Sequence, residues 1–246
     1  MNYKSLIFDL DFTAIPSVID GMPNQAVIEA VKKAKDVIKV STASGRSVQN
    51  CRNVWKAMDI TDPCIISGGS QIMNPKTEEI LWEEKLPDGA IQSVAEISRK
   101  HGLTMAINGE IFAPDTRLPE TATIIVIMSA KNEIFEDLVS AYSKLPSIAI
   151  YILPSWISTG MKDIHITHKL ATKKHAVEKL LQILGVKKEE AIGVGDGNND
   201  MPLFESVGYK VAMGNAQEVL KKSADYITDT FDNNGLAKFI EENLIK

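Results

Sequence analysis

Short apolar runs alternate with amphipathic segments at both ends of this chain. Apolar and β-branched residues in short runs predict strands, and those of the first part lie at 5–10, 37–41 and 64–66. Segments with helical spacing fall between them, at 23–35 and 48–58. Repeated alternation of strands and helices favours a parallel, doubly wound sheet.

The same alternation returns near the end of the chain. A strongly amphipathic helix is predicted over 172–184, and Gly185 is expected to end it. The strands predicted after it lie at 191–194, 210–213 and 225–227, and a closing helix is predicted at 236–244.

The middle of the chain is richer in strands and hairpins. Asn74-Pro75-Lys76-Thr77 predicts the turn of a hairpin over 72–86, and Asn108-Gly109 predicts a second turn. The other strands predicted here lie at 104–107, 111–112, 123–128, 148–153 and 161–167, and the helices at 91–100 and 134–142. This mixture indicates a separate α+β unit, inserted into an α/β core that both ends of the chain build.

Composition and charge narrow the class of protein. The 246 residues are 44% hydrophobic and 24% charged, as in ordinary globular proteins, and carry a net charge of -5. The sequence has no basic stripe of the kind that nucleic-acid binders carry. Its longest apolar stretch, 124–128, is too short to span a bilayer, and its N-terminus lacks the order of a signal peptide. Cys51 and Cys64 are too few for a disulfide framework, so we expect two reduced thiols. Together, these observations predict a cytoplasmic protein with neither nucleic-acid nor membrane partners.

Two acidic clusters stand directly after predicted strands. Asp9 and Asp11 follow Leu6-Ile7-Phe8, and Gly195-Asp196-Gly197-Asn198-Asn199-Asp200 follows 191–194. At the carboxyl ends of parallel strands, such clusters would face the crevice where open α/β sheets bind ligands. A hard cation such as Mg²⁺ takes carboxylate and carbonyl oxygens as ligands. The sequence therefore predicts a cation site built from both ends of the chain, although Asp is also common in simple turns.

Two weaker elements are candidates for binding an anion. Ser44-Gly45-Arg46 follows the strand at 37–41 and precedes a helix, so it is either a cradle for a phosphate or a plain helix cap. Lys173 stands at the start of the 172–184 helix, where a cation opposes the helix dipole. It is either a solvated surface residue or is held near anionic groups, and Lys174 competes with it for that role.

Taken in this order, the four elements resemble the haloacid dehalogenase (HAD) superfamily, in its Cof-like branch with a class IIB cap. Asp9-Leu10-Asp11-Phe12-Thr13 matches the Asp-x-Asp-x-Thr signature, and Ser44-Gly45-Arg46 stands for the usual Thr-Gly-Arg. The lysine is placed at Lys173, and residues 195–203 match the last signature. The strings 66–69, 211–216 and 234–237 are also similar to the branch. The resemblance implies a Rossmann-like α/β core at 1–84 and 165–246, and an α+β cap that selects the substrate at 85–164.

The resemblance also implies a mechanism. Asp9 would attack phosphorus and form an aspartyl-phosphate, and Asp11 would act first as general acid and then as general base. Mg²⁺ would be held by Asp9, the backbone carbonyl of Asp11 and Asp196, with Asp200 binding directly or through water. The implied substrate-binding residues are Thr13, Ser44, Gly45, Arg46, Lys173 and Asn199. Of these, Ser44, the Gly45 amide and Lys173 would bind the phosphate oxygens, Thr13 would orient the Asp9 loop, and Asn199 would contact phosphate or position Asp200.

Some positions depart from the family pattern. Phe12 stands where Gly is usual, and its ring would narrow the site or pack against the cap. Ala43-Ser44 replaces an apolar-Thr pair but keeps the hydroxyl, and Lys174 stands where Gly commonly follows the lysine. In the cap, the candidates for substrate contact by residue type alone are Arg117, Trp156 and Lys162.

The function implied is Mg²⁺-dependent hydrolysis of a small phosphorylated metabolite, such as a sugar phosphate or a phosphoglycolate-like compound. A phosphomutase of the phosphomannomutase type would use the same residues, and a non-catalytic phospho-ligand sensor would keep the same fold. The presence of both Asp9 and Asp11 argues against a sensor, because neither is required for the fold. The sequence does not distinguish a monomer from a homodimer.

Overall fold

The computed structural model describes residues 3–113, 116–130, 132–155, 158 and 160–245. The chain divides into two compact units, one formed by Met1–Trp82 together with Thr172–Lys246 and the other by Glu83–Ala171. Both ends of the chain therefore build the first unit, and the second is a continuous insertion. Within the described residues, no helix is long and apolar enough to cross a membrane.

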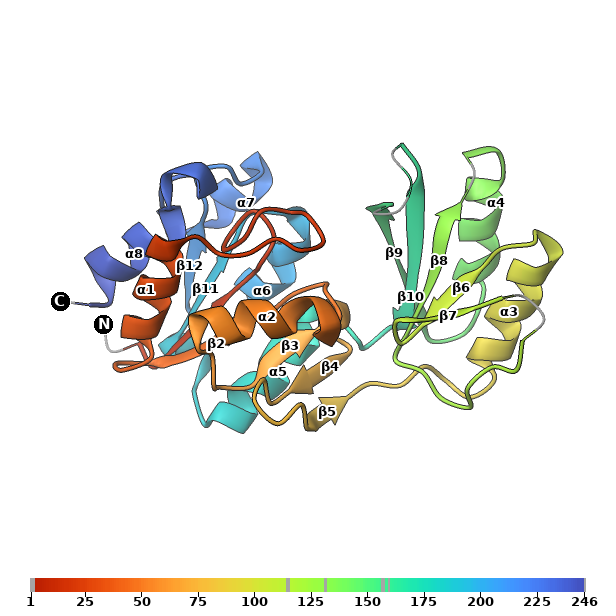
Figure 1. Ribbon diagram of the computed structural model, residues 1–246, viewed down its shortest axis with the longest axis horizontal. Helices are drawn as coiled ribbons and strands as arrows, with labels where there is room; N and C mark the ends of the chain where they lie inside the picture. Colours follow the sequence, from red (N-terminus) through yellow and green to blue (C-terminus); the bar gives the residue numbers. More distant parts are fainter. Residues whose placement is uncertain (1–2, 114–115, 131, 156–157, 159, 246) are drawn as a thin grey trace. The chain divides into compact units, whose positions relative to one another are not determined.

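A five-stranded parallel sheet forms the centre of the first unit (Figure 1). Its strands are β1 (Ser5–Phe8), β2 (Lys39–Thr42), β11 (Ala191–Gly195), β12 (Tyr209–Ala212) and β13 (Tyr226–Ile227). Their order is β13-β12-β11-β1-β2, so β1 lies between β11 and β2. Every residue of β1 and β11 is buried, as expected for strands covered on both faces. The parallel sheet predicted from the sequence is confirmed.

Helices cover both faces of this sheet (Figure 1). They are α1 (Gln25–Ala34), α2 (Val48–Met58), α5 (Lys173–Leu184), α6 (Met201–Glu205), α7 (Glu218–Ser223) and α8 (Gly235–Asn243). From β1 the chain runs outward through α1 to β2, and from β11 it runs the opposite way through α6 to β12. Right-handed crossovers in opposite directions place their helices on opposite faces. Accordingly, α1 packs beside α2 and α8, and α5 packs beside α6.

Two of these helices are absent from the sequence prediction. α6 has five residues and α7 has six. Helices this short complete fewer than two turns, so the recurrence of apolar residues that identifies a helix does not develop.

The third predicted strand joins a different sheet from the one expected. β3 (Cys64–Ile66) pairs antiparallel with β4 (Gln71–Met73), and β4 pairs with β5 (Ile80–Glu83). The strand pairing between β3 and the end of β2 is limited to a single parallel bridge, Ala43 to Ile65. The chain turns back at Ser67, Gly68 and Gly69, which all have positive φ. The hairpin predicted over 72–86 is present as β4 and β5, around the turn at Asn74–Thr77.

The second unit is an antiparallel sheet with two helices on one face (Figure 1). Its elements are α3 (Ala90–Lys100), β6 (Met105–Ile107), β7 (Glu110–Phe112), β8 (Ile124–Ala130), α4 (Asn132–Ser143), β9 (Ile148–Pro154) and β10 (Lys162–His168). The strand order is β7-β6-β8-β10-β9. Alternate residues of β8 and β10, such as Ile125 and Ile164, pack with Val94 and Leu138 in a core separate from that of the first unit. Because β10 pairs with β8 and β9, the division between the units follows Ala171, beyond the position expected at 164/165.

Candidate active site

Asp9 and Asp196 lie at the point where the strand order of the sheet reverses. Asp9 directly follows β1, and Asp196 directly follows β11, its parallel neighbour. The backbone N–H of Asp9 donates to the Val194 carbonyl over 3.0 Å, which holds the two strand ends together. Ligands of doubly wound sheets bind at this switch point, at the carboxyl ends of the strands.

Lys173 reaches both acidic clusters from the start of α5. Its Nζ lies 2.8 Å from Asp9 Oδ1 and 2.7 Å from Asp200 Oδ1, and its side chain is only 6% exposed. Lys174, by contrast, is about half exposed and pairs with Glu205 over 3.0 Å. The structure therefore places Lys173, rather than Lys174, among the carboxylates.

The backbone around Lys173 is closely packed. Thr172 caps α5 by accepting a hydrogen bond from the His175 N–H. Gly69, with φ of 105°, lies against this helix start so closely that a Cβ there would be 2.6 Å from the Lys173 N. Only glycine fits this approach without a shift of the backbone. The Ser67–Gly69 turn therefore helps to set the position of the first residue of α5, Lys173.

Asp200 is fully buried, and both of its carboxylate oxygens are engaged. Oδ1 accepts a hydrogen bond from the Lys173 ammonium, and Oδ2 accepts hydrogen bonds from the N–H groups of Asp196 and Gly197, each 3.1 Å away. A Cβ on Gly195 would lie 2.6 Å from the Asp200 carboxyl, so this position requires glycine. The turn predicted at 195–200 is thus organised around its last carboxylate.

Asp9, Asp196 and Asp200 form one cluster of carboxylates. An oxygen of each lies within 4.8 Å of the others. Thr13 is buried and its Oγ1 donates to Asp196 Oδ1 over 3.0 Å, so it orients that carboxylate. When all are ionised, three carboxylates and one ammonium leave two negative charges, which a divalent cation would balance. All-oxygen ligands of this kind fit Mg²⁺.

The titration of these groups reflects burial and mutual repulsion. Burial raises the pKa of Asp9 well above its usual range; Lys173 opposes this shift and Asp200 adds to it. Burial, followed by the charge of Asp200, raises the pKa of Asp196 to about 7. Burial alone would lower the pKa of Lys173, but Asp200 and Asp9 outweigh it and raise that pKa above its usual range. Lys173 therefore stays protonated, and its positive charge offsets part of the negative charge of the acids.

Asp11 is held apart from this cluster by Arg46. The Nε of Arg46 lies 3.1 Å from Asp11 Oδ2 and its Nη2 lies 2.7 Å from Oδ1. The same guanidinium donates to the carbonyls of Val18 and Ile19 over 2.7 and 2.8 Å, and the Arg46 side chain is 1% exposed. Arg46 was expected in the substrate-binding set; the structure instead commits these N–H groups to Asp11 and to the 18–19 backbone.

The remaining expected residues differ in exposure. Ser44 is buried, and its Oγ accepts from the Arg46 N–H over 3.1 Å; it does not cap the next helix, because the N-cap of α2 is Ser47. Gly45 is exposed, and the space where its Cβ would stand is open for 4 Å. Asn199 is exposed beside the acidic cluster. In the second unit, Arg117 and Lys162 are exposed, Lys162 lies over the Phe135 ring, and Trp156 lies outside the described residues.

Asn215 contacts the loop that follows Asp11 but was given no role by the sequence analysis. Its Nδ2 donates to the Phe12 carbonyl over 3.0 Å, and its Oδ1 accepts from the Phe231 N–H over 2.7 Å. It thereby joins the loop after Asp11 to the C-terminal part of the chain. The signal in the sequence was the string 211–216, but a carboxamide bridging two backbones leaves no pattern that spacing alone can detect.

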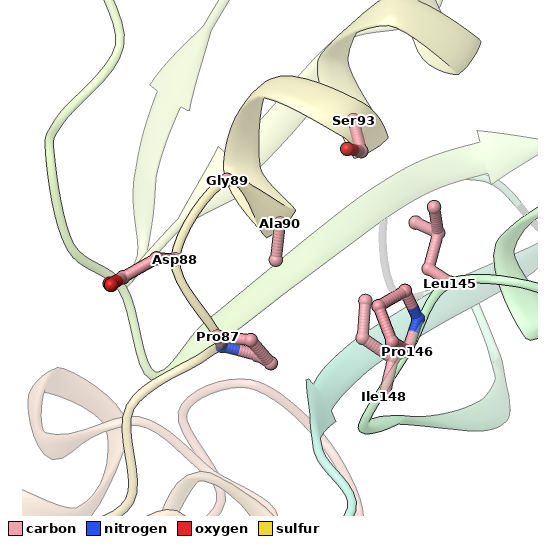
Figure 2. Close-up of a pocket in the computed structure, with 8 residues that line it drawn as sticks. All are labelled: Pro87, Asp88, Gly89, Ala90, Ser93, Leu145, Pro146 and Ile148. Atoms are coloured by element: carbon pink, nitrogen blue, oxygen red, sulfur yellow. The ribbon is translucent and has the colours of Figure 1, made fainter.

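A small cavity in the second unit does not compete with this site (Figure 2). Its volume is about 90 Å³, below the roughly 300–1,000 Å³ of pockets that enclose small ligands. Its single acidic lining residue, Asp88, extends away from the other side chains (Figure 2). The lining residues are Pro87, Asp88, Gly89, Ala90, Ser93, Leu145, Pro146 and Ile148.

Comparison with known proteins agrees with this fold. A family model described as haloacid dehalogenase-like hydrolase matches residues 6–113 and 107–240, so the chain belongs to this family. Among solved structures, a haloacid dehalogenase-like hydrolase from Bacteroides thetaiotaomicron superposes with a TM-score of 0.84 and 24% identity, covering 98% of this chain and 99% of that chain. The resemblance inferred from the four motifs is confirmed.

Two curated relatives are named for phosphatase activities. The chain is 47% identical to phosphoglycolate phosphatase 1 of Saccharolobus solfataricus over 89 residues, which cover 36% of this chain and 39% of that relative. It is 26% identical to a 5-amino-6-(5-phospho-D-ribitylamino)uracil phosphatase of Bacillus subtilis over 251 residues, which cover 98% of this chain and 95% of that relative.

Proposed function

We propose that this protein is a Mg²⁺-dependent phosphatase that hydrolyses a small phosphorylated metabolite through an aspartyl-phosphate. The observation that carries the proposal is the placement of Asp9. One of its oxygens is bound by Lys173, and the other accepts no hydrogen bond from the described residues. A buried carboxylate with one oxygen held and one oxygen open is arranged to act as a nucleophile.

In the first step, Asp9 attacks phosphorus while the bond from phosphorus to the leaving oxygen breaks. Asp11 gives a proton to that oxygen, so an alcohol leaves and an aspartyl-phosphate remains. In the second step, Asp11 takes a proton from a water that attacks the same phosphorus. The bond to Asp9 breaks, inorganic phosphate leaves, and both carboxyl groups return to their starting states.

Arg46 is proposed to act through Asp11 rather than on phosphate. Two hydrogen bonds fix the plane of the Asp11 carboxyl, and the Asp11 side chain is still 23% exposed. A general acid must lie within hydrogen-bond reach of the leaving oxygen, and a fixed plane keeps it there. Arg46 is thus proposed as a positioning residue.

Asp9, Asp196 and the backbone carbonyl of Asp11 are proposed to hold the cation. Asp200 has partners on both oxygens, which favours contact through a metal-bound water over direct ligation. The cation would offset repulsion between Asp9 and an anionic phosphate and would polarise the phosphoryl group.

The non-bridging phosphate oxygens are proposed to face Lys173, the Gly45 amide and the Ser44 hydroxyl. The ammonium is buried and preoriented, and the Gly45 backbone is open to an approaching ligand. Fixed donors of this kind stabilise the charge that develops on the phosphoryl group. Asn199, exposed at the edge of the cluster, is proposed to contact phosphate.

The substrate is proposed to be a sugar phosphate or a phosphoglycolate-like compound. The curated relatives named above support phosphorylated metabolites of low molecular mass. The second unit is proposed to select among these substrates. The groups proposed to act on phosphorus all belong to the α/β core, so the inserted unit is free to supply residues that contact the rest of the substrate.

The test is phosphate release from a panel of phosphorylated metabolites, with and without Mg²⁺. The native chain is compared with the Asp9→Asn variant. The matched control is Asp20→Asn, because Asp20 is an exposed acid outside the carboxylate cluster. We expect release that needs Mg²⁺, is lost in Asp9→Asn and persists in Asp20→Asn. Release that survives Asp9→Asn would contradict the proposal. An isomerised sugar phosphate in place of free phosphate would indicate the mutase instead.

A further inference from the structure

Phe12 stands in a backbone conformation that its side chain makes unfavourable. It lies between Asp11 and Thr13, and its φ is 53°. In this left-handed region, residues with a Cβ are strained, whereas glycine is not. A strained residue beside a reactive group is a reason to look for a function of its side chain.

The surrounding contacts hold Phe12 in this conformation. Its N–H donates to the Ile15 carbonyl over 2.8 Å, and its carbonyl accepts from Asn215 over 3.0 Å. On the next residue, the Thr13 hydroxyl is tied to Asp196. Both neighbours of Phe12 are thus parts of the site, and the conformation is over-determined by hydrogen bonds from three directions.

The ring of Phe12 is largely exposed to solvent, and so are the apolar side chains of Val18 and Ile19. Phe12 is 52% exposed, Val18 57% and Ile19 49%. Arg46 bridges from the Asp11 carboxylate to the carbonyls of Val18 and Ile19, so these residues lie about one guanidinium away from Asp11. We name Phe12, Val18 and Ile19 the apolar rim.

The apolar rim lies near Asp11, the group proposed to meet the leaving alcohol. Under the proposed function, on which this inference rests, Asp11 comes within hydrogen-bond distance of the leaving oxygen. Phe12 directly follows Asp11, with adjacent Cα atoms only about 3.8 Å apart, so its exposed side chain is within reach of the first atoms beyond that oxygen. An exposed ring at this position gains by covering apolar or aromatic surface of the leaving group.

We propose that Phe12 is a specificity-determining residue within the substrate range proposed above. It favours a phosphomonoester whose alcohol presents an apolar face, such as the C–H face of a sugar ring, close to the ester oxygen, over a small polar alcohol such as that of a phosphoglycolate-like compound. Val18 and Ile19, whose backbone Arg46 holds, offer further exposed apolar surface in the same part of the chain. A leaving group that is polar on all sides gains nothing from the rim.

The experiment compares kcat/KM for benzyl phosphate and ethyl phosphate in the presence of Mg²⁺. Both esters release simple primary alcohols of similar basicity, so the ratio of the two values reports on contact with the ring. The variants are Phe12→Gly, which also relieves the backbone strain, Phe12→Asn, which tolerates positive φ, and Phe12→Tyr, which keeps a ring. Val37→Ala is the control, since Val37 is equally exposed at 55% but precedes β2, at the opposite end of the strand from the site.

We expect the benzyl-to-ethyl ratio to fall about tenfold in Phe12→Gly and Phe12→Asn, and to stay near native in Phe12→Tyr and Val37→Ala. A ratio unchanged in the first two variants, while the native chain hydrolyses both esters, would overturn the role of Phe12 and leave the proposed function intact. If the native chain released phosphate from neither ester nor any compound of the metabolite panel, the proposed function itself would fail, and this inference with it.

Discussion

The guanidinium of Arg46 contacts both carboxylate oxygens of Asp11, through Nε at 3.1 Å and Nη2 at 2.7 Å. The pair joins the second sequence element to the first, and the same guanidinium holds the backbone at Val18 and Ile19. A residue that the resemblance placed in the substrate-binding set is therefore bound to the candidate general acid.

Arg46→Lys tests which of these roles applies. Lysine keeps the positive charge but cannot hold both carboxylate oxygens and two carbonyls in one plane. We expect kcat to fall about 10- to 100-fold, because a displaced general acid is costly, while KM stays within about threefold. A large rise in KM with kcat preserved would assign Arg46 to phosphate binding. In a double-mutant cycle with Asp11→Asn, the two effects should be strongly non-additive.

Lys173→Met and Lys174→Met are a matched pair of substitutions at adjacent positions. Lys173 is buried between Asp9 and Asp200, so its removal leaves uncompensated carboxylates. We expect about 3–5 kcal/mol lower stability of the metal-free chain at neutral pH and a loss of about 10²–10³ in kcat. Lys174 pairs with Glu205 at the surface, where solvent screens the pair, so its removal should change stability little. Denaturant unfolding and steady-state kinetics measure both effects. Equal losses in the two variants would refute the assignment.

Gly69→Ala and Gly68→Ala separate backbone strain from steric contact. Both residues have positive φ, but only at Gly69 would a Cβ meet the start of α5. We expect Gly68→Ala to cost about 1 kcal/mol through strain alone, and Gly69→Ala to cost clearly more and to lower activity by displacing Lys173. Thermal unfolding and kinetics of the two variants provide the check. Activity unimpaired in a folded Gly69→Ala variant would mean that the turn does not position Lys173.

The raised pKa of Asp196, about 7, predicts how pH affects the metal-free chain. Because folding raises this pKa above its ordinary value near 4, the folded state favours the protonated acid. This contribution is fully present below about pH 4 and is lost as pH rises through about 7. We expect the metal-free Tm to fall between about pH 5 and 7.5, with a shallower fall in Asp196→Asn.

Mg²⁺ should reverse this trend, because a cation binds the deprotonated carboxylates. Its stabilising effect on Tm is expected to grow over the same pH interval. A stabilisation by Mg²⁺ that is as large at the acidic end as at the basic end would show that the cluster does not exchange protons for the cation.

The local elements were predictable where a pattern lies within one segment. The strand before Asp9, the helix at 48–58 and the glycine that ends α5 depend on neighbouring residues, and the structure contains all three. The prediction that β3 joins the parallel sheet was wrong. Three successive positive φ values at Ser67, Gly68 and Gly69 turn the chain back after a single bridge to the end of β2, so β3 pairs with β4 instead. Such a reversal depends on what the turn packs against, which hydrophobic spacing does not report.

The sequence by itself identified the candidate residues of the site: the acids at 9, 11, 196 and 200, and a lysine at 173 or 174. These residues are recognisable because a core has no use for carboxylates placed directly after apolar strands. Only the tertiary structure decided between the two lysines, bound Arg46 to Asp11, and joined Asn215 to Phe12 across 203 positions. The physical reason is that burial and hydrogen-bond partners depend on which strand ends become neighbours, and β1 meets β11 only once the sheet has formed.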